Sequence, residues 1–239
     1  MKNNCICVFD SGIGGLTLLK NLVNLTKGER YVYFGDNENS PYGNKTKDFL
    51  LSLTKKNLEY LKSFNPKIIV VACNTLTENC IDDIRKMTRV KVFGIEPAIN
   101  LALREKGQSM LICTYATARS DKLKERLYPY KNKFVLCPQR ELAKSIQENV
   151  FSLEQVNVDF IDKYKDITNI VLGCTHYTFL KERLKKRYPK IKILDGNEGT
   201  AKNVVNYLSD NGLLRKGVQS VEFVGNSKEF NKKVFESMK

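Results

Sequence analysis

The fold of this chain follows from two similar stretches, Lys67-Ile-Ile-Val-Val-Ala-Cys-Asn-Thr75 and Asn169-Ile-Val-Leu-Gly-Cys-Thr-His-Tyr177. In each, an apolar run rich in β-branched residues leads into a small residue, a cysteine and two polar side chains. Continuous apolar runs of this length are typical of buried strands in a parallel sheet. The repetition predicts two related halves of about a hundred residues each, with one cysteine at the end of a strand in each half.

The rest of the chain alternates short β-branched runs with longer segments of helical periodicity. Such alternation is typical of parallel sheets covered by helices on both faces. We therefore predict an α/β fold of two pseudo-symmetric lobes, each a mostly parallel sheet flanked by helices, with the active site in the cleft between them. The expected strands are 5–10, 30–34, 68–72, 90–94, 110–113, 134–137, 170–172, 192–194 and 221–224. The expected helices include 15–25, 47–64, 78–87, 99–106, 141–150 and 179–187.

The segment Gly94-Ile-Glu-Pro97 is the predicted crossing point between the halves. The last expected strand comes after the second half is complete, so we expect it to return to the first sheet. The predicted first lobe therefore comprises residues 1–95 and 210–239, and the predicted second lobe comprises residues 96–209. The linkers contain no Ser/Gly/Pro-rich stretch, which favours closely packed lobes.

Composition narrows the class of protein. The chain has 239 residues, of which 42% are hydrophobic, enough to bury a sizeable core. No apolar run is long enough for a membrane helix, and the apolar start is too short for a signal peptide, so we expect a cytoplasmic protein with no membrane partner. Its seven cysteines form no C-x-x-C pair. We therefore expect free thiols in a reducing compartment and no metal site.

The formal net charge of +14 raises the question of a nucleic-acid partner. Lysine is scattered along the whole chain, however, and the densest basic run, residues 181–190, carries apolar residues at helical spacing. That pattern is typical of a solvated helix face. We regard nucleic acid as an unlikely partner, while a basic surface can help attract a small anionic substrate.

In open parallel sheets, ligands bind beyond the carboxyl ends of the strands. One such loop, Ser11-Gly-Ile-Gly-Gly15, resembles a phosphate loop, but it lacks the spacing of the known phosphate motifs and follows Asp10, whose charge would repel phosphate. An ammonium group would suit Asp10 better. A purely structural role, in which Asp10 caps the following helix, remains an alternative.

Cys73 and Cys174 share a setting that the other cysteines lack. Each follows a small residue, precedes polar side chains and lies where a helix is expected to begin, so the helix N-terminus is expected to lower its thiol pKa. His176, the only histidine, follows Cys174 by two residues and can tune that thiol or hold substrate. We interpret the remaining cysteines as structural: Cys5, Cys7, Cys80, Cys113 and Cys137.

Five motifs and the tail carry a family resemblance. They are Phe9-Asp-Ser-Gly-Ile-Gly-Gly-Leu16, Gly35-Asp36 with Pro41-Tyr-Gly-Asn-Lys45, Ala72-Cys-Asn-Thr75, Thr114-Tyr-Ala-Thr-Ala-Arg-Ser120, Gly173-Cys-Thr-His-Tyr177 and the tail Phe223-Val-Gly-Asn-Ser-Lys-Glu-Phe230. Together they resemble the cofactor-independent aspartate/glutamate racemase family. Thr-His after the second cysteine, rather than Thr-Glu, resembles its glutamate branch.

The resemblance implies racemisation of L-glutamate to D-glutamate for peptidoglycan synthesis, without a cofactor. Inversion at one carbon needs a base on one face and an acid on the other, which two thiols can supply. The implied catalytic residues are Cys73, Cys174, Asp10 and His176, with Asp10 assisting Cys73 and His176 assisting Cys174. The implied substrate-binding residues are Ser11, Tyr42, Gly43, Asn74, Thr75, Thr117 and Thr175. The implied partner is glutamate, and a homodimer is the assembly considered.

Three segments depart from the family pattern. Thr178 stands where proline is common, the loop 37–40 is unusual, and the segment 137–145 lacks an expected glutamate, with Ser145 near its place. Glu148 lies one turn later and is assigned no catalytic role. Two alternatives stay open: racemisation of aspartate or another acidic amino acid, and a homologue without turnover that acts as a binding protein.

Overall fold

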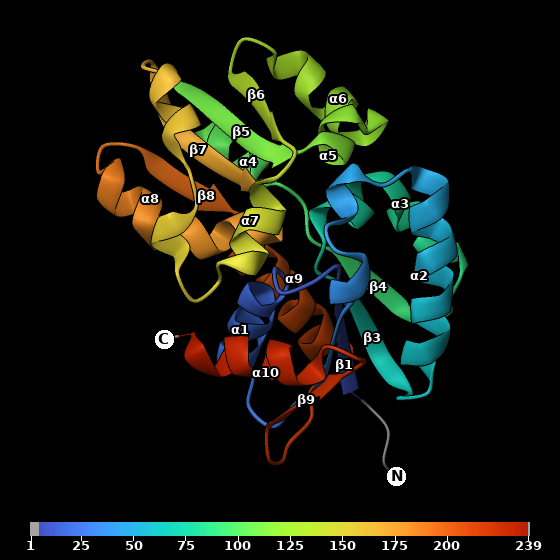
Figure 1. The fold of residues 1–239 in the computed structure, drawn as a ribbon. Coiled ribbons are helices and arrows are strands. Elements are labelled where there is room, and N and C mark those ends of the chain that lie inside the picture. Colours follow the sequence, from blue (N-terminus) through green and yellow to red (C-terminus); the bar gives the residue numbers. More distant parts are fainter. Residues whose placement is uncertain (1–4, 239) are drawn as a thin grey trace.

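The computed structural model describes residues 5–238, and within them nine strands form two sheets (Figure 1). Every neighbouring pair of strands is parallel. The first sheet has the order β4-β3-β1-β2-β9, with β1 (Cys5–Asp10), β2 (Arg30–Gly35), β3 (Pro66–Val71), β4 (Lys91–Gly94) and β9 (Ser220–Val224). The second has the order β6-β5-β7-β8, with β5 (Gln108–Thr114), β6 (Phe134–Gln139), β7 (Ile167–Gly173) and β8 (Lys192–Asp195).

The two sheets share one strand order. Counted from the first strand of each lobe, both read 2-1-3-4, and β9 extends the first sheet beside β2. Each expected strand is present within a few residues of its expected bounds, so the prediction of an α/β fold with two related lobes is confirmed. Cys73 follows the third strand of the first lobe, and Cys174 follows the third strand of the second. The repeated motif therefore marks equivalent positions in the two halves.

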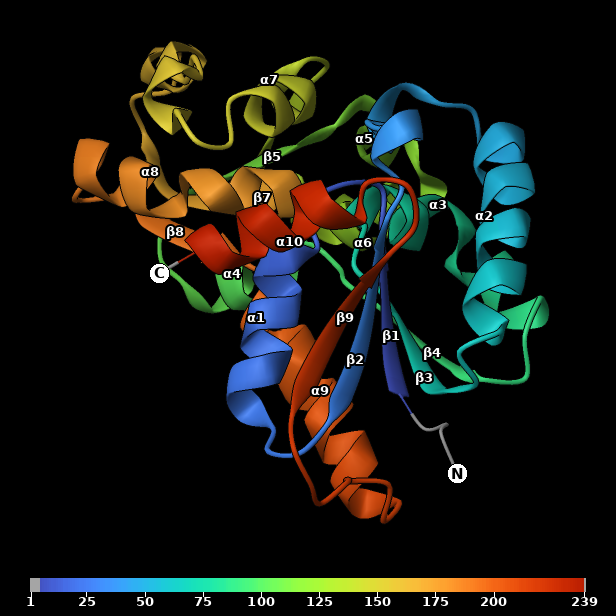
Figure 2. The same ribbon diagram turned by 60° about the horizontal axis from the view of Figure 1, so that its bottom comes forward.

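Alternation along the strands sends side chains of the first sheet into two cores. Ile6 and Val8 of β1 face one core, whereas Cys5, Cys7 and Phe9 face the other. Helices cover both faces, as Figure 2 shows. One layer contains α1 (Leu16–Leu25), α9 (Asn197–Asp210) and α10 (Lys228–Ser237), and the other contains α2 (Lys47–Lys62) and α3 (Asn74–Lys86).

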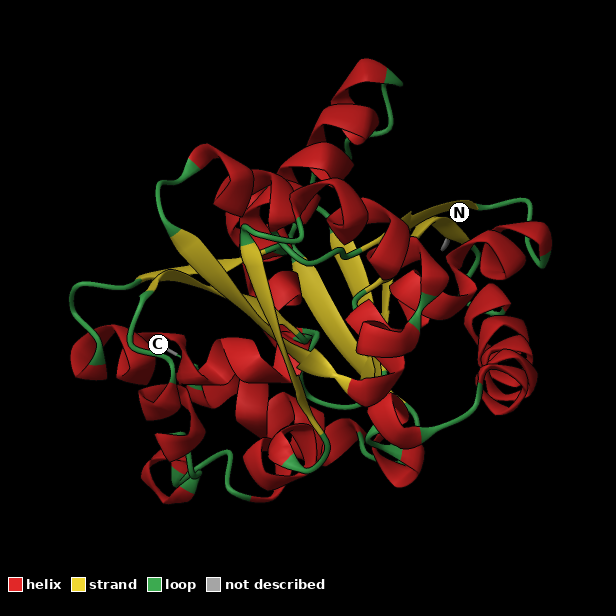
Figure 3. Ribbon diagram, turned by 90° about the horizontal axis from the view of Figure 1, so that it is seen from above, coloured by secondary structure: helices red, strands yellow, loops and turns green. Residues whose placement is uncertain are grey.

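The second sheet also has a core on each face, and Figure 3 shows the strands of the molecule, seen from above, among the surrounding helices. Met110 and Ile112 of β5 face a core that α7 (Leu142–Glu148) and α8 (Lys181–Arg187) complete. Leu111 and Cys113 face the opposite core. The helices on that side are α4 (Ile99–Arg104), α5 (Tyr115–Arg119) and α6 (Asp121–Leu127).

Two predicted helices begin at other residues in the structure, and α5, α6, α9 and α10 are not among the helices named in the prediction. α3 begins at Asn74 rather than Glu78, directly after Cys73, and a 3₁₀ helix, η6 (Thr175–Leu180), precedes α8. α9 was not expected, although Ala201, Val204 and Leu208 have helical spacing and are fully buried.

α9 packs against α1, and its buried residues belong to the core of the first sheet, although the predicted lobe boundary assigns most of this helix to the second lobe. The lobe boundaries stay a prediction. None of the helices within residues 5–238 combines the length and apolarity needed to cross a membrane.

Candidate active site

Strand pairing brings Asp10 and Cys73 to the same edge of the first sheet. β1 pairs with β3 up to Phe9 and Val71, and the Ala72 amide continues the ladder by donating to the Phe9 carbonyl at 2.7 Å. In the second sheet, Cys113 pairs with Gly173, which places Thr114 and Cys174 at the corresponding edge. These two edges face each other across the interface between the lobes.

Asp10 is fully buried, and its two carboxylate oxygens have different partners. Oδ2 accepts hydrogen bonds from the Gly15 amide at 2.9 Å and the Gly12 amide at 3.1 Å, which closes the glycine loop before α1. Oδ1 lies 3.5 Å from the hydroxyl of Thr175 in the opposite lobe. Oδ2 therefore has the structural role of holding the loop before α1, whereas Oδ1 faces the interface between the lobes. Burial raises the Asp10 pKa to about 6, against the lowering effect of these donors.

Cys73 caps α3 and is buried, with its thiol donating to Ser11 Oγ at 3.7 Å. Burial, followed by the negative charge of Asp10, raises its pKa to about 12. The amides of Leu76 and Thr75, at the helix N-terminus, act in the opposite direction and are outweighed. The expectation of a lowered thiol pKa is therefore wrong for this arrangement, because desolvation exceeds the helix-terminus effect.

Cys174 caps η6 and is also buried. Burial raises its pKa well above the usual range, and a negative charge on Cys73 raises it further. A hydrogen bond from the His176 amide lowers the pKa of Cys174, but burial outweighs this effect. Burial lowers the pKa of the His176 imidazole to about 4, so the ring is neutral at pH 7.

Threonine hydroxyls from both lobes meet beside the thiols. Thr75 Oγ1 lies 3.0 Å from Thr114 Oγ1 and 3.5 Å from Thr117 Oγ1, and Thr114 is 3.0 Å from Thr117. Asn74 is buried next to them and donates to the Ile95 carbonyl at 3.4 Å. Thr114 was not among the predicted site residues, although its place at the end of β5 was a usable signal.

The side chain of Tyr42 is hydrogen-bonded within the first lobe and is not directed to a substrate. Its hydroxyl donates to Asp36 Oδ2 at 2.5 Å, so only its backbone remains available to a ligand. The backbone of Gly43 lies very close to the second lobe, since a Cβ at this position would lie 2.6 Å from Thr114 Cβ. Any larger residue at position 43 would force the lobes apart.

All eleven predicted site residues are buried. The structure brings them together at the interface between the lobes, with contributions from the ends of β1, β3, β5 and β7. These residues are therefore shielded from solvent in this arrangement.

Gln147 of α7 is the residue that the motif analysis missed. Its Oε1 lies 2.9 Å from His176 Nε2 and accepts a hydrogen bond from Ser40 Oγ at 3.1 Å. It therefore joins the catalytic histidine candidate to the first lobe. Glu148 is exposed and lies 3.9 Å from Lys144, which agrees with its having no assigned role. Ser145 is not among the contacts of His176.

We expect Gln147→Glu to raise the pKa of His176 by about one unit or more, because a carboxylate beside the imidazole favours its charged form. His176 is the only histidine, so its ring-proton NMR signal can be followed against pH without ambiguity. Gln155→Glu, an exposed position in the same lobe, is the control with the same charge change. Equal titration of His176 in both variants would contradict the contact.

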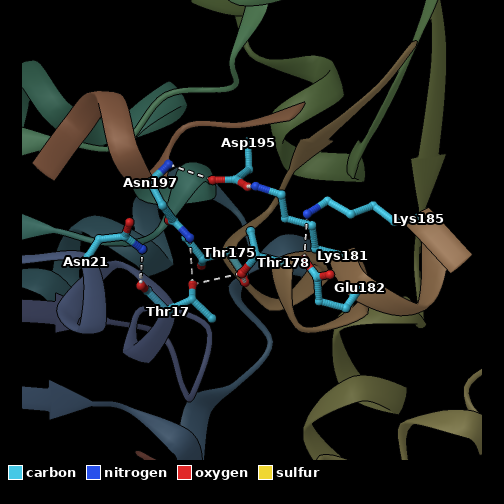
Figure 4. Close-up of polar contacts among 9 residues, drawn as sticks. All are labelled: Thr17, Asn21, Thr175, Thr178, Lys181, Glu182, Lys185, Asp195 and Asn197. Atoms are coloured by element: carbon cyan, nitrogen blue, oxygen red, sulfur yellow. Dashed lines mark hydrogen bonds and ion pairs between the residues drawn. The ribbon is translucent and has the colours of Figure 1, made fainter. Parts of the chain in front are cut away.

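A polar network behind the second thiol ties its loop to the first lobe (Figure 4). Thr178 donates to the Thr175 carbonyl at 2.6 Å and lies 2.8 Å from the Thr17 hydroxyl, which also accepts from Asn197 Nδ2 at 3.0 Å. Lys181 and Asp195 form an ion pair at 2.6 Å in the same network. The residue that replaces the expected proline therefore anchors η6 to α1.

The other five cysteines pack in the apolar cores, and all seven cysteines are free thiols. Within residues 5–238, no three His, Cys, Asp or Glu side chains are grouped so that they could hold a metal ion. The expectation that the reaction needs neither metal nor cofactor stays a prediction.

Comparison with known proteins places this chain in a class. Residues 38–204 match the profile of the Asp/Glu/Hydantoin racemase family. A glutamate racemase of Clostridium botulinum is 38% identical, over 99% of this chain and 98% of its own length. The chain therefore belongs to the Asp/Glu/hydantoin racemase family, and it is an isomerase of the racemase type.

Solved structures agree with this placement. Glutamate racemase RacE1 of Bacillus anthracis has a TM-score of 0.78 and 27% identity, covering 99% of this chain and 92% of its own. The Francisella tularensis glutamate racemase, solved in complex with D-glutamate, has a TM-score of 0.79 and 25% identity, covering 99% and 95%. Within the family, the resemblance of this chain is thus to the glutamate racemases.

Proposed function

We propose that this chain interconverts L- and D-glutamate by a two-base mechanism in which Cys73 and Cys174 act on opposite faces of the α-carbon. One observation carries this proposal. The two buried thiols follow equivalent third strands of two lobes with the same strand order, and their neighbours meet at the interface, where Thr175 Oγ1 lies 3.5 Å from Asp10 Oδ1. Substrate and product are mirror images at one carbon, so two equivalent half-sites suit the reaction.

The polar groups around the thiols support an amino acid as the substrate. Asp10, with a pKa of about 6, is ionised at pH 7 and can pair with the α-ammonium group. Neutral donors surround it and can hold the carboxylates. These are the side chains of Ser11, Asn74, Thr75, Thr117 and Thr175, with Thr114 added, and the backbone at Tyr42 and Gly43. The names of the related racemases support glutamate as the amino acid.

The raised thiol pKa values set a condition on the mechanism. The raised pKa values favour the protonated form of both thiols, whereas proton abstraction needs one thiolate. A bound α-ammonium group adds a positive charge near Asp10, and a nearby opposite charge favours the thiolate. We therefore expect binding of the substrate to activate the base.

Each direction of the reaction balances in protons. The Cys73 thiolate takes the α-proton from one enantiomer, the electron pair of the C–H bond stays on the α-carbon, and the Cys174 thiol gives its proton to the opposite face. Cys73 is then a thiol and Cys174 a thiolate, which is the starting state for the reverse direction. Asp10 assists Cys73, and His176, neutral at pH 7, assists Cys174. The proposed role in the cell is supply of D-glutamate for peptidoglycan in the cytoplasm.

The proposal is tested by incubating the protein with L-glutamate, and separately with L-aspartate, in deuterated water without added cofactor. Proton NMR follows the α-proton while chiral chromatography follows the enantiomers. We expect loss of the glutamate signal with appearance of D-glutamate. A clear preference for aspartate would refute the substrate, and tight D-glutamate binding without exchange would indicate a binding protein.

A further inference from the structure

A second pocket adjoins the candidate active site at the interface between the lobes. It has a volume of about 320 Å³, within the range of small-ligand sites. The first lobe contributes residues 43–47 and Asn79, and the second contributes Tyr115, Ala116, Arg119 and Arg140. Gly43, which touches Thr114 of the threonine cluster, forms a wall shared with the active site.

The lining of this pocket is strongly basic. Four of its side chains are cations, namely Lys45, Lys47, Arg119 and Arg140, and none is a carboxylate. Lys47 forms an ion pair with Asp83 at 3.1 Å. No ion pair involves the other three within residues 5–238. They therefore present uncompensated positive charge to the hollow.

Aromatic rings hold these cations in place. The guanidinium groups of Arg119 and Arg140 lie 5.9 and 5.4 Å from the centre of the same ring, that of Tyr115. Lys45 lies 5.4 Å from the ring centre of Phe49, at the start of α2. Cation–π contacts order the cations without neutralising them. An excess of 14 positive charges guarantees unpaired cations on this protein, but here three of them converge in one hollow without a carboxylate.

We propose that this pocket binds a phosphate-bearing polyanion. Guanidinium forks match the oxygens of a phosphate group, and two of them beside an ammonium group fit a ligand with at least two negative charges. The substrate carboxylates would have neutral partners inside the buried site, so the two sites differ in the anions they take.

Occupancy of the pocket would act across the lobes. Lys45 belongs to the first lobe, whereas Arg119 and Arg140 belong to the second, so an anion between them bridges the interface. Bridging favours this arrangement of the lobes and raises the stability of the folded protein by mass action. This inference does not depend on which amino acid the racemase converts, because the pocket has a different ligand and is lined by different side chains from those that would hold the substrate.

Pyrophosphate is a suitable probe, titrated calorimetrically and by thermal shift with KCl at equal ionic strength as the reference. We expect saturable binding and a rise in Tm beyond that in KCl, with affinity at least about 10-fold weaker in Arg119→Gln/Arg140→Gln, since each charged hydrogen bond contributes strongly. Arg89→Gln/Arg104→Gln is the matched control, because both arginines are exposed and outside the pocket. It is expected to bind like the wild type.

Two outcomes would overturn the proposal. One is the absence of saturable binding, or equal affinity in all three proteins. The other is displacement of pyrophosphate by glutamate with unchanged affinity in Arg119→Gln/Arg140→Gln, which would place the anion in the active site. Lys45→Gln tests the first-lobe contribution separately, and it is expected to weaken binding and to reduce the rise in Tm. Unchanged binding in this variant would refute the bridge.

Discussion

Cys73→Ser and Cys174→Ser are each expected to lower the racemisation rate by about 10³-fold or more, which is within the range for loss of a general acid or base. A hydroxyl is a far weaker acid than a thiol, so serine can neither take the α-proton nor deliver one at a useful rate. Both positions are helix caps, where serine is well tolerated, so the fold is expected to remain intact.

Isotope exchange separates the roles of the two thiols. Each single variant keeps one base, which can remove and return the α-proton of one enantiomer without inversion. In deuterated water we therefore expect slow exchange with one enantiomer only in Cys73→Ser and with the other enantiomer in Cys174→Ser. Exchange of both enantiomers by one variant would contradict the assignment of opposite faces.

Cys137→Ser is the control for these variants. Cys137 lies within β6 and accepts a hydrogen bond from Gln139 Nε2 at 3.4 Å, so a serine hydroxyl has a partner there. We expect its activity to match the wild type. An active Cys174→Ser variant would refute the two-thiol mechanism.

Asp10→Asn is expected to decrease activity by about 100-fold or more while stabilising the fold at pH 7. The pKa of Asp10 in the folded protein, about 6, is above the ordinary value of 3.8 for an aspartate. Its contribution to stability is therefore fully present below pH 3.8 and is lost as the pH rises through 6. A shift of this size corresponds to about 3 kcal/mol at full ionisation. Asparagine keeps an oxygen for the amides of Gly12 and Gly15 and avoids the buried charge.

Urea denaturation between pH 3.5 and 8 measures this effect. We expect the free energy of unfolding of Asp10→Asn to exceed that of the wild type by up to about 3 kcal/mol above pH 7, with the difference vanishing below about pH 4. Asp166→Asn removes the same charge from an exposed position and is expected to change neither activity nor stability. A less stable Asp10→Asn at pH 7 would show that the buried carboxylate stabilises the fold.

Much of the architecture was predictable because it rests on local patterns. Strands buried on both faces need continuous apolar runs, and the runs ending at Ala72 and Leu172 were visible for that reason. Parallel topology then brings the carboxyl ends of the strands to one edge of each sheet, so Asp10, Cys73 and Cys174 could be proposed as site residues without coordinates. The register and the strand order repeated between the lobes agree with this expectation.

α9 was not predicted from the local sequence pattern. Its buried residues have helical spacing, but polar neighbours dilute the signal in the sequence. Its packing on α1, in the core of the first sheet, depends on a chain path that returns from the second lobe. Local periodicity cannot predict that the chain returns to the first sheet in this way.

An α/β chain of two related halves, each with a thiol followed by hydroxyl or amide side chains at an equivalent strand end, could be predicted from residue order alone. The contact between Gln147 and His176, which are 29 positions apart, became visible only in the folded structure. The folded structure also explains why the pKa values of both thiols are raised, because residues from distant segments bury them. Sequence spacing encodes what neighbouring residues on one element do, whereas contact across elements and desolvation arise only when distant segments meet.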